Sequence, residues 1–319
     1  MESVDPPARG AGAGSRLSKA AAMKRVLLTG ASGFIGAHVA AELLRRGYEV
    51  HATVHSSALP EHPRLIPHRV NLLAPAELAR LLQAGRYETL VHMAWYVGPK
   101  CHVHPGNVEW LAAGLHLLRL FAEHGGRVFV GAGSCSEYEY KYGLLTEGLT
   151  PTNPGTLYGN AKNAFYHMAA LYCEQQGLVC KWPRIFNCYG PMEKPQRLMP
   201  AVMRACLRGE DVRVSDCCKR QDYLHVEDTA RAIAAVLESP LQGAVNICSG
   251  VPVLLRRIVQ LIAELTGSRS RILWGALPAA FGESLVVGNN DKLSSIGWAP
   301  TYSLEDGLRQ TINWWKKHV

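Results

Sequence analysis

The sequence predicts an α/β protein in which helices cover both faces of a parallel sheet, with a smaller C-terminal lobe attached. Short apolar runs alternate with amphipathic helical segments as far as about residue 180. Strands and helices in alternation form a parallel sheet, because each right-handed crossover returns the chain beside the previous strand. A glycine-rich turn joins the first strand to the first helix, and beyond residue 180 Pro and Gly interrupt the order. The later part is therefore expected to form a smaller lobe, intercalated with the first.

The order of elements follows from the length and spacing of the apolar residues. Brief apolar runs that end in Gly or polar residues predict buried strands, and apolar residues at helical spacing predict helices. The predicted strands lie at 24–29, 48–54, 90–93 and 127–130, and the first helix lies at 36–46. The first 22 residues are rich in Ala, Gly, Ser and Pro without hydrophobic periodicity, so a disordered tail is expected at 1–22. Folded structure is expected from Met23.

Composition narrows the class of partner and the compartment. The formal charge of +8 suits an anionic ligand, although net charge alone is weak evidence. No dense Lys/Arg run with interleaved aromatics is present, which argues against nucleic acid as a partner. No apolar stretch is long enough to span a membrane and the N-terminus lacks a signal-peptide core, so we expect no membrane partner and a cytoplasmic location. The nine cysteines lack zinc-site spacing, so we expect reduced thiols and no metal site.

The pattern Gly30-x-x-Gly33-x-x-Gly36 stands where a strand ends and a helix begins. In that context glycines permit a tight turn and a close approach of backbone to a pyrophosphate, and the helix N-terminus favours the anion. The alternative is a Gly-rich turn that binds nothing. The pattern therefore predicts a Rossmann domain with a dinucleotide cofactor. The intervening residues Ser32, Phe34 and Ile35 are expected cofactor contacts as well.

The end of the second strand indicates which dinucleotide is bound. An NAD-selective site usually places Asp or Glu there, to accept from the ribose hydroxyls. This chain has Thr53-Val54-His55-Ser56-Ser57 instead, with no acid. Because His55 and Ser56 can donate to a 2′-phosphate, NADP(H) is favoured, and NAD(H) is the alternative. The simpler interpretation of His55 is an exposed loop residue.

Tyr158 and Lys162 stand four residues apart, which places both side chains on one face of a helix. A lysine charge beside a phenol can stabilise a tyrosinate and lower the tyrosine pKa, so that the phenol serves as a general acid or base. Taken alone, the pattern Tyr-x-x-x-Lys is weak, because a solvated salt-bridging face would show it too. The upstream glycine loop supplies the cofactor that such chemistry needs.

Together these motifs resemble the extended short-chain dehydrogenase/reductase family, in its nucleotide-sugar epimerase, dehydratase and 4-ketoreductase branch. The resemblance runs from Met23 to Trp315. Besides the glycine loop and the Tyr158/Lys162 pair, the matching segments are Asn107, 184–191, 197–200, 220–228 and 297–300. It implies an NAD(P)-binding Rossmann domain at 23–180 and a mainly substrate-binding lobe at 181–319, intercalated with it.

The resemblance also implies roles for single residues. Tyr158 and Lys162 would form a catalytic triad with a serine. Ser134 is the first choice, and Ser136 is the alternative if the segment aligns with the family motif in a shifted register. Either serine could instead cap a turn. The remaining cofactor contacts implied are Asn71, Leu72, Ala94 and Asn107. The substrate contacts implied are Trp95, Ser136, Asn187, Arg197 and Arg220, with Arg220 clamping the diphosphate through its planar fork.

Departures from the family's motifs narrow the reaction. A 4,6-dehydratase carries an Asp-Glu pair after its catalytic Ser or Thr, and this chain has Cys135 and Ser136. The epimerases of GDP-fucose synthesis pair a cysteine with a histidine, and that histidine position is Arg197 here. The motifs therefore favour NADPH-dependent reduction of an NDP-4-keto-6-deoxyhexose at C4. The alternatives are an NAD-dependent 4-epimerase of the UDP-glucose/galactose type and a non-enzymatic NADP-binding redox sensor.

Three further expectations concern parts of the chain outside the chemistry. Asp222, His225 and Asp228 are expected to brace the lobe interface. The loop 98–104, with its two histidines, is expected to be exposed, with a cover over the substrate as the alternative. The family's habit of dimerising through a helix bundle implies a homodimer, for which the helix of Tyr158 could supply a face or else contribute to the core; the residues concerned are Phe165, Met168, Ala169 and Tyr172.

Overall fold

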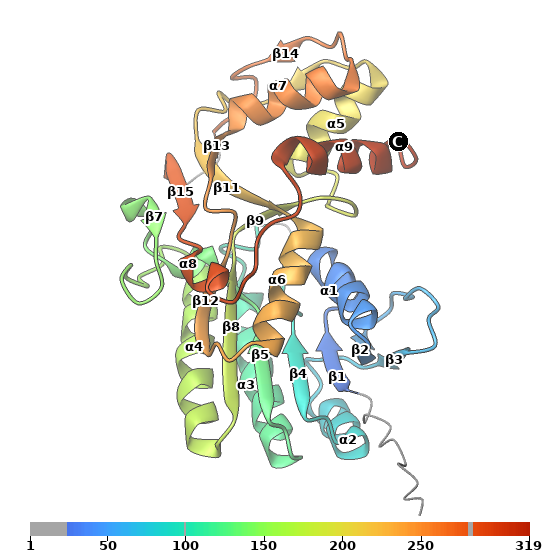
Figure 1. Ribbon diagram of the computed structural model, residues 1–319, viewed down its shortest axis with the longest axis vertical. Coiled ribbons are helices and arrows are strands. Elements are labelled where there is room, and N and C mark those ends of the chain that lie inside the picture. Colours follow the sequence, from blue (N-terminus) through green and yellow to red (C-terminus); the bar gives the residue numbers. More distant parts are fainter. Residues whose placement is uncertain (1–23, 99, 280–282) are drawn as a thin grey trace, which may run out of the picture.

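A computed structural model describes residues 24–98, 100–279 and 283–319 (Figure 1). The expected tail at 1–22 lies outside these described residues. The first structural unit is an eight-stranded sheet in the order β12-β8-β5-β4-β1-β2-β3, with β6 beside β8, and all its pairings are parallel. Its strands are β1 Arg25–Thr29, β2 Glu49–Val54, β3 Leu65–Arg69, β4 Thr89–His92, β5 Val128–Gly131, β6 Gly133–Ser134, β8 Val179–Ile185 and β12 Gly243–Ile247. The predicted α/β class and Rossmann-like sheet are confirmed.

Helices cover both faces of this sheet (Figure 1). On one face α1 packs against α6, and on the other α3 packs against α2 and α4. The bounds are α1 Phe34–Arg45, α2 Pro75–Gly85, α3 Gly106–Glu123, α4 Leu157–Gln176 and α6 Val226–Glu238. A separate apolar core fills each side, one around Val39 and Ile233 and the other around Phe121 and Phe165. The inner strands β1, β4 and β5 are buried on both faces, which explains their apolar runs, whereas the edge strand β3 is partly exposed.

Local sequence sets the ends of α4, the helix that carries Tyr158 and Lys162. Thr156 caps its N-terminus, with its Oγ1 accepting from the backbone N–H of Gly159 at 3.1 Å. Gly177 ends it in the left-handed conformation, at φ 70°. On the sheet side Phe165 and Ala169 are fully buried, so they belong to the core. Met168 is 55% exposed on the same helix, which leaves an apolar residue free on its outer face.

The second lobe gathers three helices and a mixed sheet above the first unit (Figure 1). The helices α5 Leu198–Arg208, α7 Leu255–Thr266 and α9 Leu304–Trp315 enclose their own apolar core. The sheet runs β13-β11-β15-β7 with β9 beside β11, and its strands are β7 Leu144–Leu145, β9 Asn187–Tyr189, β11 Arg220–His225, β13 Pro252–Leu254 and β15 Leu285–Gly288. A short parallel pair, β10 Val212–Arg213 and β14 Ile272–Leu273, completes it, whereas the helix α8 Asp291–Ser294 packs against β12 of the first unit.

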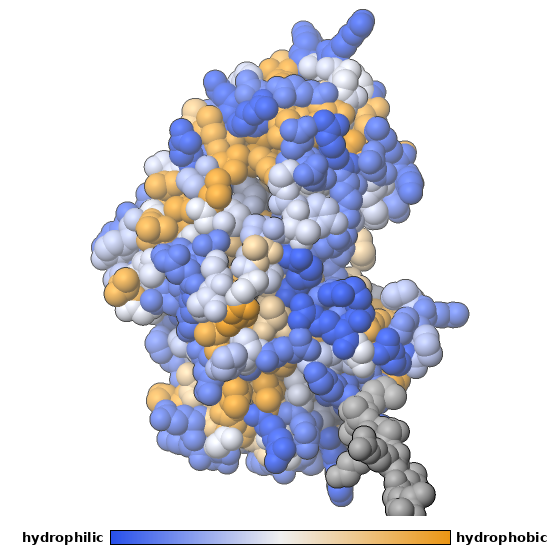
Figure 2. All heavy atoms as spheres, viewed as in Figure 1, coloured by the Kyte–Doolittle hydropathy of each residue, from blue (hydrophilic) through white to orange (hydrophobic). Residues whose placement is uncertain are grey.

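The two units are interwoven along the chain. β7 precedes residue 180 yet pairs with β15 of the second lobe, while α6 and β12 follow residue 181 yet belong to the first unit. Wherever the chain passes from one unit to the other, it places backbone in the region between them. Hydrophilic residues cover much of the face shown in Figure 2, with apolar ones gathered over the second lobe. No helix of the described residues is long and apolar enough to cross a membrane.

Candidate active site

A cavity of about 1220 Å³ lies between the two units and receives side chains from both. Its floor is the carboxyl end of the parallel sheet, where the glycine loop, the end of β4 and the start of α4 meet. Its roof comes from the second lobe, from β9, α5 and β11. Ligands of open α/β sheets bind at this edge, so the cavity is where the sequence motifs predict chemistry.

The glycine loop forms the end of the cavity nearest α1. Gly30 has φ +76°, and a Cβ there would lie 2.7 Å from the backbone nitrogen of Ala94. A Cβ on Gly36 would lie 2.0 Å from the Gly30 carbonyl oxygen. Only glycine fits either position, so backbone approaches backbone closely at the N-terminus of α1. This cradle fits a dinucleotide pyrophosphate.

The structure brings most of the predicted cofactor contacts into this cavity. Its lining includes Gly30, Ser32, Gly33, Phe34, Ile35, Gly36, His55, Asn71, Leu72 and Ala94. Asn107 is different, because it is fully buried behind the wall. Its Oδ1 accepts from Trp95 Nε1 at 2.9 Å, and its Nδ2 donates to the carbonyls of Cys101 and His104 at 2.7 and 2.8 Å. Asn107 therefore holds Trp95 and the loop before α3 in place.

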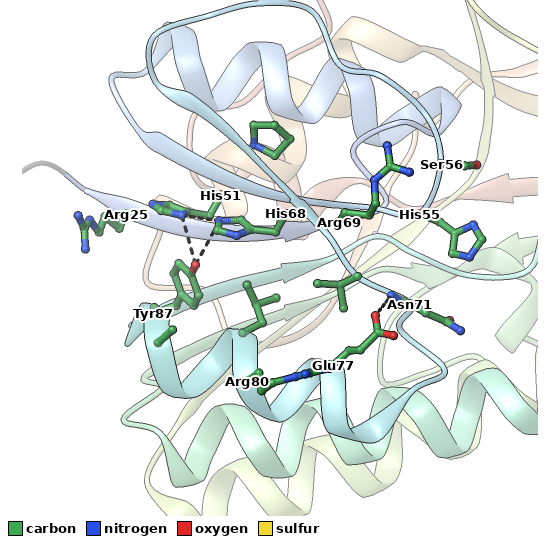
Figure 3. A pocket seen from close by; sticks show the side chains of 15 residues that line it. Arg25, His51, His55, Ser56, His68, Arg69, Asn71, Glu77, Arg80 and Tyr87 are labelled. Atoms are coloured by element: carbon green, nitrogen blue, oxygen red, sulfur yellow. Dashed lines mark hydrogen bonds between the residues drawn. The ribbon is translucent and has the colours of Figure 1, made fainter.

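Ser56 lines a second hollow, which adjoins the first through His55 and Asn71 (Figure 3). Figure 3 shows His55, Ser56 and Arg69 on the strand ends at one side and Arg80 on α2 at the other. Arg69 and Arg80 make no ion pair among the described residues. The hollow past β2 is thus lined by arginines and Ser56 and also by one acid, Glu77, which accepts from the backbone N–H of Asn71 at 2.8 Å.

Tyr158 and Lys162 face the cavity together with Ser134. A hydrogen bond with Ser134 lowers the pKa of Tyr158, but burial acts more strongly and raises that pKa well above the usual range. Lys162 donates from Nζ to the carbonyl of Ala132 at 2.7 Å and lies 3.9 Å from the centre of the Trp95 ring. Burial lowers the pKa of Lys162 to about 7. The expected lowering of the Tyr158 pKa by Lys162 is therefore not found in the protein by itself, because desolvation outweighs it.

The two candidate serines have different partners. Ser134 hydrogen-bonds with Tyr158, whereas Ser136 Oγ lies 3.0 Å from the hydroxyl of Tyr140, and both serines line the cavity. The position of Ser134 depends on Glu137, which the sequence reasoning missed. Glu137 is fully buried, accepts from the backbone N–H of Ser134 at 2.8 Å and forms an ion pair with Arg184 at 2.7 Å. A charged residue three positions after a serine is a capping-box signal that could have revealed it.

The second lobe contributes Asn187 and Arg197 to the lining, but Arg220 is exposed and does not line the cavity. Side chains alternate along β11, so Gln221 and Tyr223 face the cavity and Arg220 does not. Gln221 accepts from Asn187 Nδ2 at 3.2 Å. The structure therefore does not place Arg220 at the cavity as a clamp, which the period of two along the strand could have revealed.

Other polar residues line the cavity as well. They include His102 of the loop before α3 and several that the sequence reasoning missed, among them Tyr140, Glu193, Lys194, Arg213 and Lys219. Lys194 reaches across it and donates from Nζ to the carbonyl of Val97 at 2.7 Å. The ring of His102 lies edge-on to that of Tyr158, with centroids 5.6 Å apart. The loop before α3, apart from residue 99, which lies outside the described residues, therefore packs beside Tyr158. Lys100, His102 and Val103 are exposed, in agreement with the first of the two interpretations of this loop.

Comparison with known proteins agrees with this geometry. A sequence model of the NAD dependent epimerase/dehydratase family matches residues 26–248. Among curated relatives, the UDP-glucose epimerase YtcB of Bacillus subtilis, described as uncharacterised, is 26% identical over 90% of this chain and 96% of its own. The CDP-abequose synthase of Salmonella muenchen is 23% identical over 91% of this chain and 97% of its own. Among solved structures, Thermus thermophilus UDP-glucose 4-epimerase in complex with NAD is 27% identical, with a TM-score of 0.84 over 92% of this chain and all of that one.

Proposed function

The chain belongs to the NAD dependent epimerase/dehydratase family, and from that premise we propose that it reduces an NDP-4-keto-6-deoxyhexose at C4 with NADPH. The observation that carries the proposal is the meeting of Ser134, Tyr158 and Lys162 beside a glycine cradle whose neighbouring strand ends without an acid. NADPH, when bound, supplies the hydride. The protein's own residues bind the sugar, orient its carbonyl and provide the proton.

The protonation state of Tyr158 suits reduction. Burial keeps its phenol neutral at neutral pH, and a neutral phenol can give a proton to a ketone oxygen that is becoming an alkoxide. Ser134 hydrogen-bonds the same phenol and can polarise the carbonyl. Lys162, with its pKa near 7, carries a proton part of the time and can restore the one that Tyr158 gives away. One proton and one hydride complete a ketone reduction.

Water elimination has less support, because the carboxylate near Ser134 is already engaged. Glu137 is paired with Arg184 and accepts from Trp182 Nε1 at 3.0 and 3.1 Å, so it faces away from substrate. Cys135 is buried, and burial raises the pKa of its thiol to about 11. A thiol of that pKa stays protonated at neutral pH, so almost no thiolate is present to act as a base.

The preference for NADP(H) is supported by the hollow past β2. His55, Ser56 and the two arginines of Figure 3 offer donors where an NAD-selective site would place a carboxylate. Arg69 is the nearer of the arginines along the strands, since it ends β3 directly beside Val54 of β2. A guanidinium there can bind a 2′-phosphate through its planar fork.

The sugar nucleotide is proposed to lie under the second lobe. Arg197 and Arg213 line that part of the cavity and can bind a diphosphate, the role expected of Arg220. Asn187 and Ser136 remain proposed sugar contacts, together with Trp95. We propose a cytoplasmic homodimer, in which the exposed apolar residues Met168 and Leu171 of α4 meet a second copy.

One specific observation favours a 4-epimerase as the second candidate. The Thermus thermophilus 4-epimerase is 27% identical and was solved with NAD. An epimerase could use the same three catalytic residues, but Tyr158 would then have to act first as a base. A redox sensor has less support, because both Tyr158 and Lys162 face the cavity.

The test is the oxidation of NADPH, followed by absorbance, on mixing the protein with CDP- or dTDP-4-keto-6-deoxyglucose. We expect one NADPH consumed for each ketone, and about tenfold slower use of NADH, the size of one charge-assisted phosphate contact. Arg69→Ala should remove that preference. Conversion of UDP-glucose to UDP-galactose without net consumption of NADPH would favour the epimerase, and binding without oxidation would favour the sensor.

A further inference from the structure

Glu193 is a buried acid in the wall of the cavity, and the proposed reduction gives it no role. Its side chain is only 7% exposed, in the segment that leads from β9 to α5, and it lines the cavity. Its backbone N–H donates to the carbonyl of Gly190 at 3.3 Å, which fixes the turn that carries it. The carboxyl is therefore placed by the fold and presented to whatever the cavity holds.

The carboxyl is incompletely paired among the described residues. Its Oε2 atom is buried and has no hydrogen-bond partner. Its Oε1 atom lies 3.7 Å from Nε of Arg197, which is beyond hydrogen-bond distance, and the Arg197 side chain is 63% exposed. Buried polar atoms are nearly always hydrogen-bonded, because an unpaired one costs about 1–3 kcal/mol. An unpaired oxygen in a ligand cavity points to a ligand as its partner.

The groups that face Glu193 come from three elements. Arg197 belongs to its own segment and precedes α5, Cys188 comes from β9, and Tyr223 comes from β11. Arg197 is the only cation of these and also acts on His102 across the cavity, where it lowers the imidazole pKa together with burial. Burial raises the pKa of Glu193 to about 8, and Arg197 offsets this only in part. At neutral pH the carboxyl therefore holds a proton.

We propose that Glu193 binds the sugar nucleotide directly: the diphosphate draws the Arg197 guanidinium to itself, and the protonated carboxyl of Glu193 donates a hydrogen bond to an oxygen of the sugar. This assignment rests on the proposed function, since it needs an anion and a sugar in one ligand. An anion alone would account for Arg197 but not for the unpartnered oxygen of Glu193, and a sugar alone would account only for that oxygen. An arginine held loosely by an acid is free to move to an anion, and the buried Oε2 atom of the acid still lacks a partner, which a neutral group of the sugar can supply.

The assignment makes binding depend on pH in a definite direction. Above pH 8 Glu193 ionises, loses its donor and attracts Arg197 away from the diphosphate. Affinity for the sugar nucleotide should therefore fall about tenfold from pH 7 to pH 9, the ratio of protonated fractions for one group titrating at about 8. Below pH 7 the same group should cause little further change.

The experiment measures binding by calorimetry in the NADPH-loaded protein. The probe is the tightest binder of the wild type among UDP-, CDP- and dTDP-glucose, and the matching nucleoside diphosphate serves as the sugar-free ligand. Glu193→Ala should bind the sugar nucleotide about tenfold more weakly at pH 7 and the diphosphate as the wild type does, the effect of one lost hydrogen bond. Glu193→Gln keeps a donor, so it should bind within about twofold of wild type at pH 7 and lose the pH dependence. Glu210→Gln, an exposed acid of the same lobe, is the matched control.

Three outcomes would overturn the assignment. If Glu193→Ala binds the sugar nucleotide as the wild type does, the carboxyl makes no contact, and only the assignment fails. If a carbon-13 titration of the ligand-free protein, with the Glu193 signal identified by its loss in Glu193→Gln, has its midpoint below pH 5, the carboxyl holds no proton to donate. If the wild type binds none of the three probes, the proposed function fails first and the assignment with it.

Discussion

Two groups of buried polar side chains stand in contrast, one around the cavity and one where the two units join. Around the cavity, Lys162 and Glu193 are desolvated and short of partners, and burial moves both pKa values toward neutrality. At the junction, Asp222 and Asp228 are buried too, but donors surround their carboxylates. The free-energy cost of burying a charge is therefore largely unrelieved around the cavity, whereas hydrogen-bond donors offset much of it at the junction.

Both carboxylates at the junction have donors on each oxygen, although burial still raises the pKa of Asp222. Asp222 accepts from the backbone N–H groups of Ser249, Gly250 and Gly288 and from the hydroxyl of Ser249, at 2.7–3.2 Å. It thereby ties β11 of the second lobe to the loop after β12 of the first unit. Asp228 accepts from Thr301 and Tyr302, which ties α6 to the segment before α9. The expectation that these acids brace the interface agrees with their contacts.

The contrast gives a rule for this molecule. A buried charge with full partners holds parts of the fold together, because removing it strands several donors at once. A buried ionisable group with few partners is available for a ligand or a proton. Four changes test this division, from the largest expected effect to the smallest.

Replacing Tyr158 by Phe should lower the rate of ketone reduction about a thousandfold, the usual contribution of a general acid. The free energy of unfolding and the Kd for NADPH should change little, because the variant loses one hydrogen bond, the one with Ser134, and keeps the buried ring. Stopped-flow absorbance gives the rate and fluorescence titration the Kd. Full activity in this variant would remove Tyr158 from the catalytic role.

Replacing Asp222 by Ala should cost about 3 kcal/mol of unfolding free energy, because three backbone N–H groups lose their acceptor in a buried site. The midpoint of urea denaturation measures the loss. Asp216→Ala, an exposed acid of the same lobe, should change it by less than about 0.5 kcal/mol. If the two variants are equally stable, Asp222 does not hold the two units together, and the contrast between junction and cavity acids fails.

Replacing Asp228 by Asn should cost about 2 kcal/mol, since the amide keeps one acceptor but loses the other and the 3.1 Å ion pair with Arg231. The loss should be smaller than for Asp222→Ala, in the same denaturation experiment. Hydrogen exchange should locate it, with protection falling in α9 rather than across the whole molecule. Uniform loss of protection would show that Asp228 supports the entire fold.

The change at His92 should have the smallest effect on stability. Its ring resembles both groups, because one nitrogen has a hydrogen-bond partner and the other, Nε2, has none among the described residues. Burial lowers its pKa to about 3, and its Nδ1 atom bonds with Thr29 Oγ1 at 2.8 Å. The folded state therefore keeps the neutral ring while the unfolded chain takes up a proton near pH 6.5, so stability falls as pH falls below that value. Between pH 7 and pH 5.5 the contribution should be about 1 kcal/mol. His92→Asn should show a correspondingly flatter decline, and an unchanged slope would contradict the burial of a neutral ring.

Much of the fold could be predicted from the sequence, because its signals are local. The strand at β1, the turn at Gly30 and the helix after it follow from the identity and spacing of neighbouring residues. The predicted strands match the structure within one or two residues. Helix α1 begins at Phe34, two residues before the predicted start, because Gly33 is its N-cap. Tyr158 and Lys162 share a helix face for the same reason, since four residues span about one turn.

What the tertiary structure alone decided is how each of these side chains is solvated and what it meets. The register of β11 turns Arg220 outward and Gln221 inward, and the packing of α3 points Asn107 at Trp95. Segments far apart in sequence bury Tyr158 and Glu193, and this burial sets the direction of both pKa shifts. Spacing along the chain fixes which groups are neighbours on one element. The free energy of a charge depends on everything within a few ångströms, and only the folded chain determines what that is.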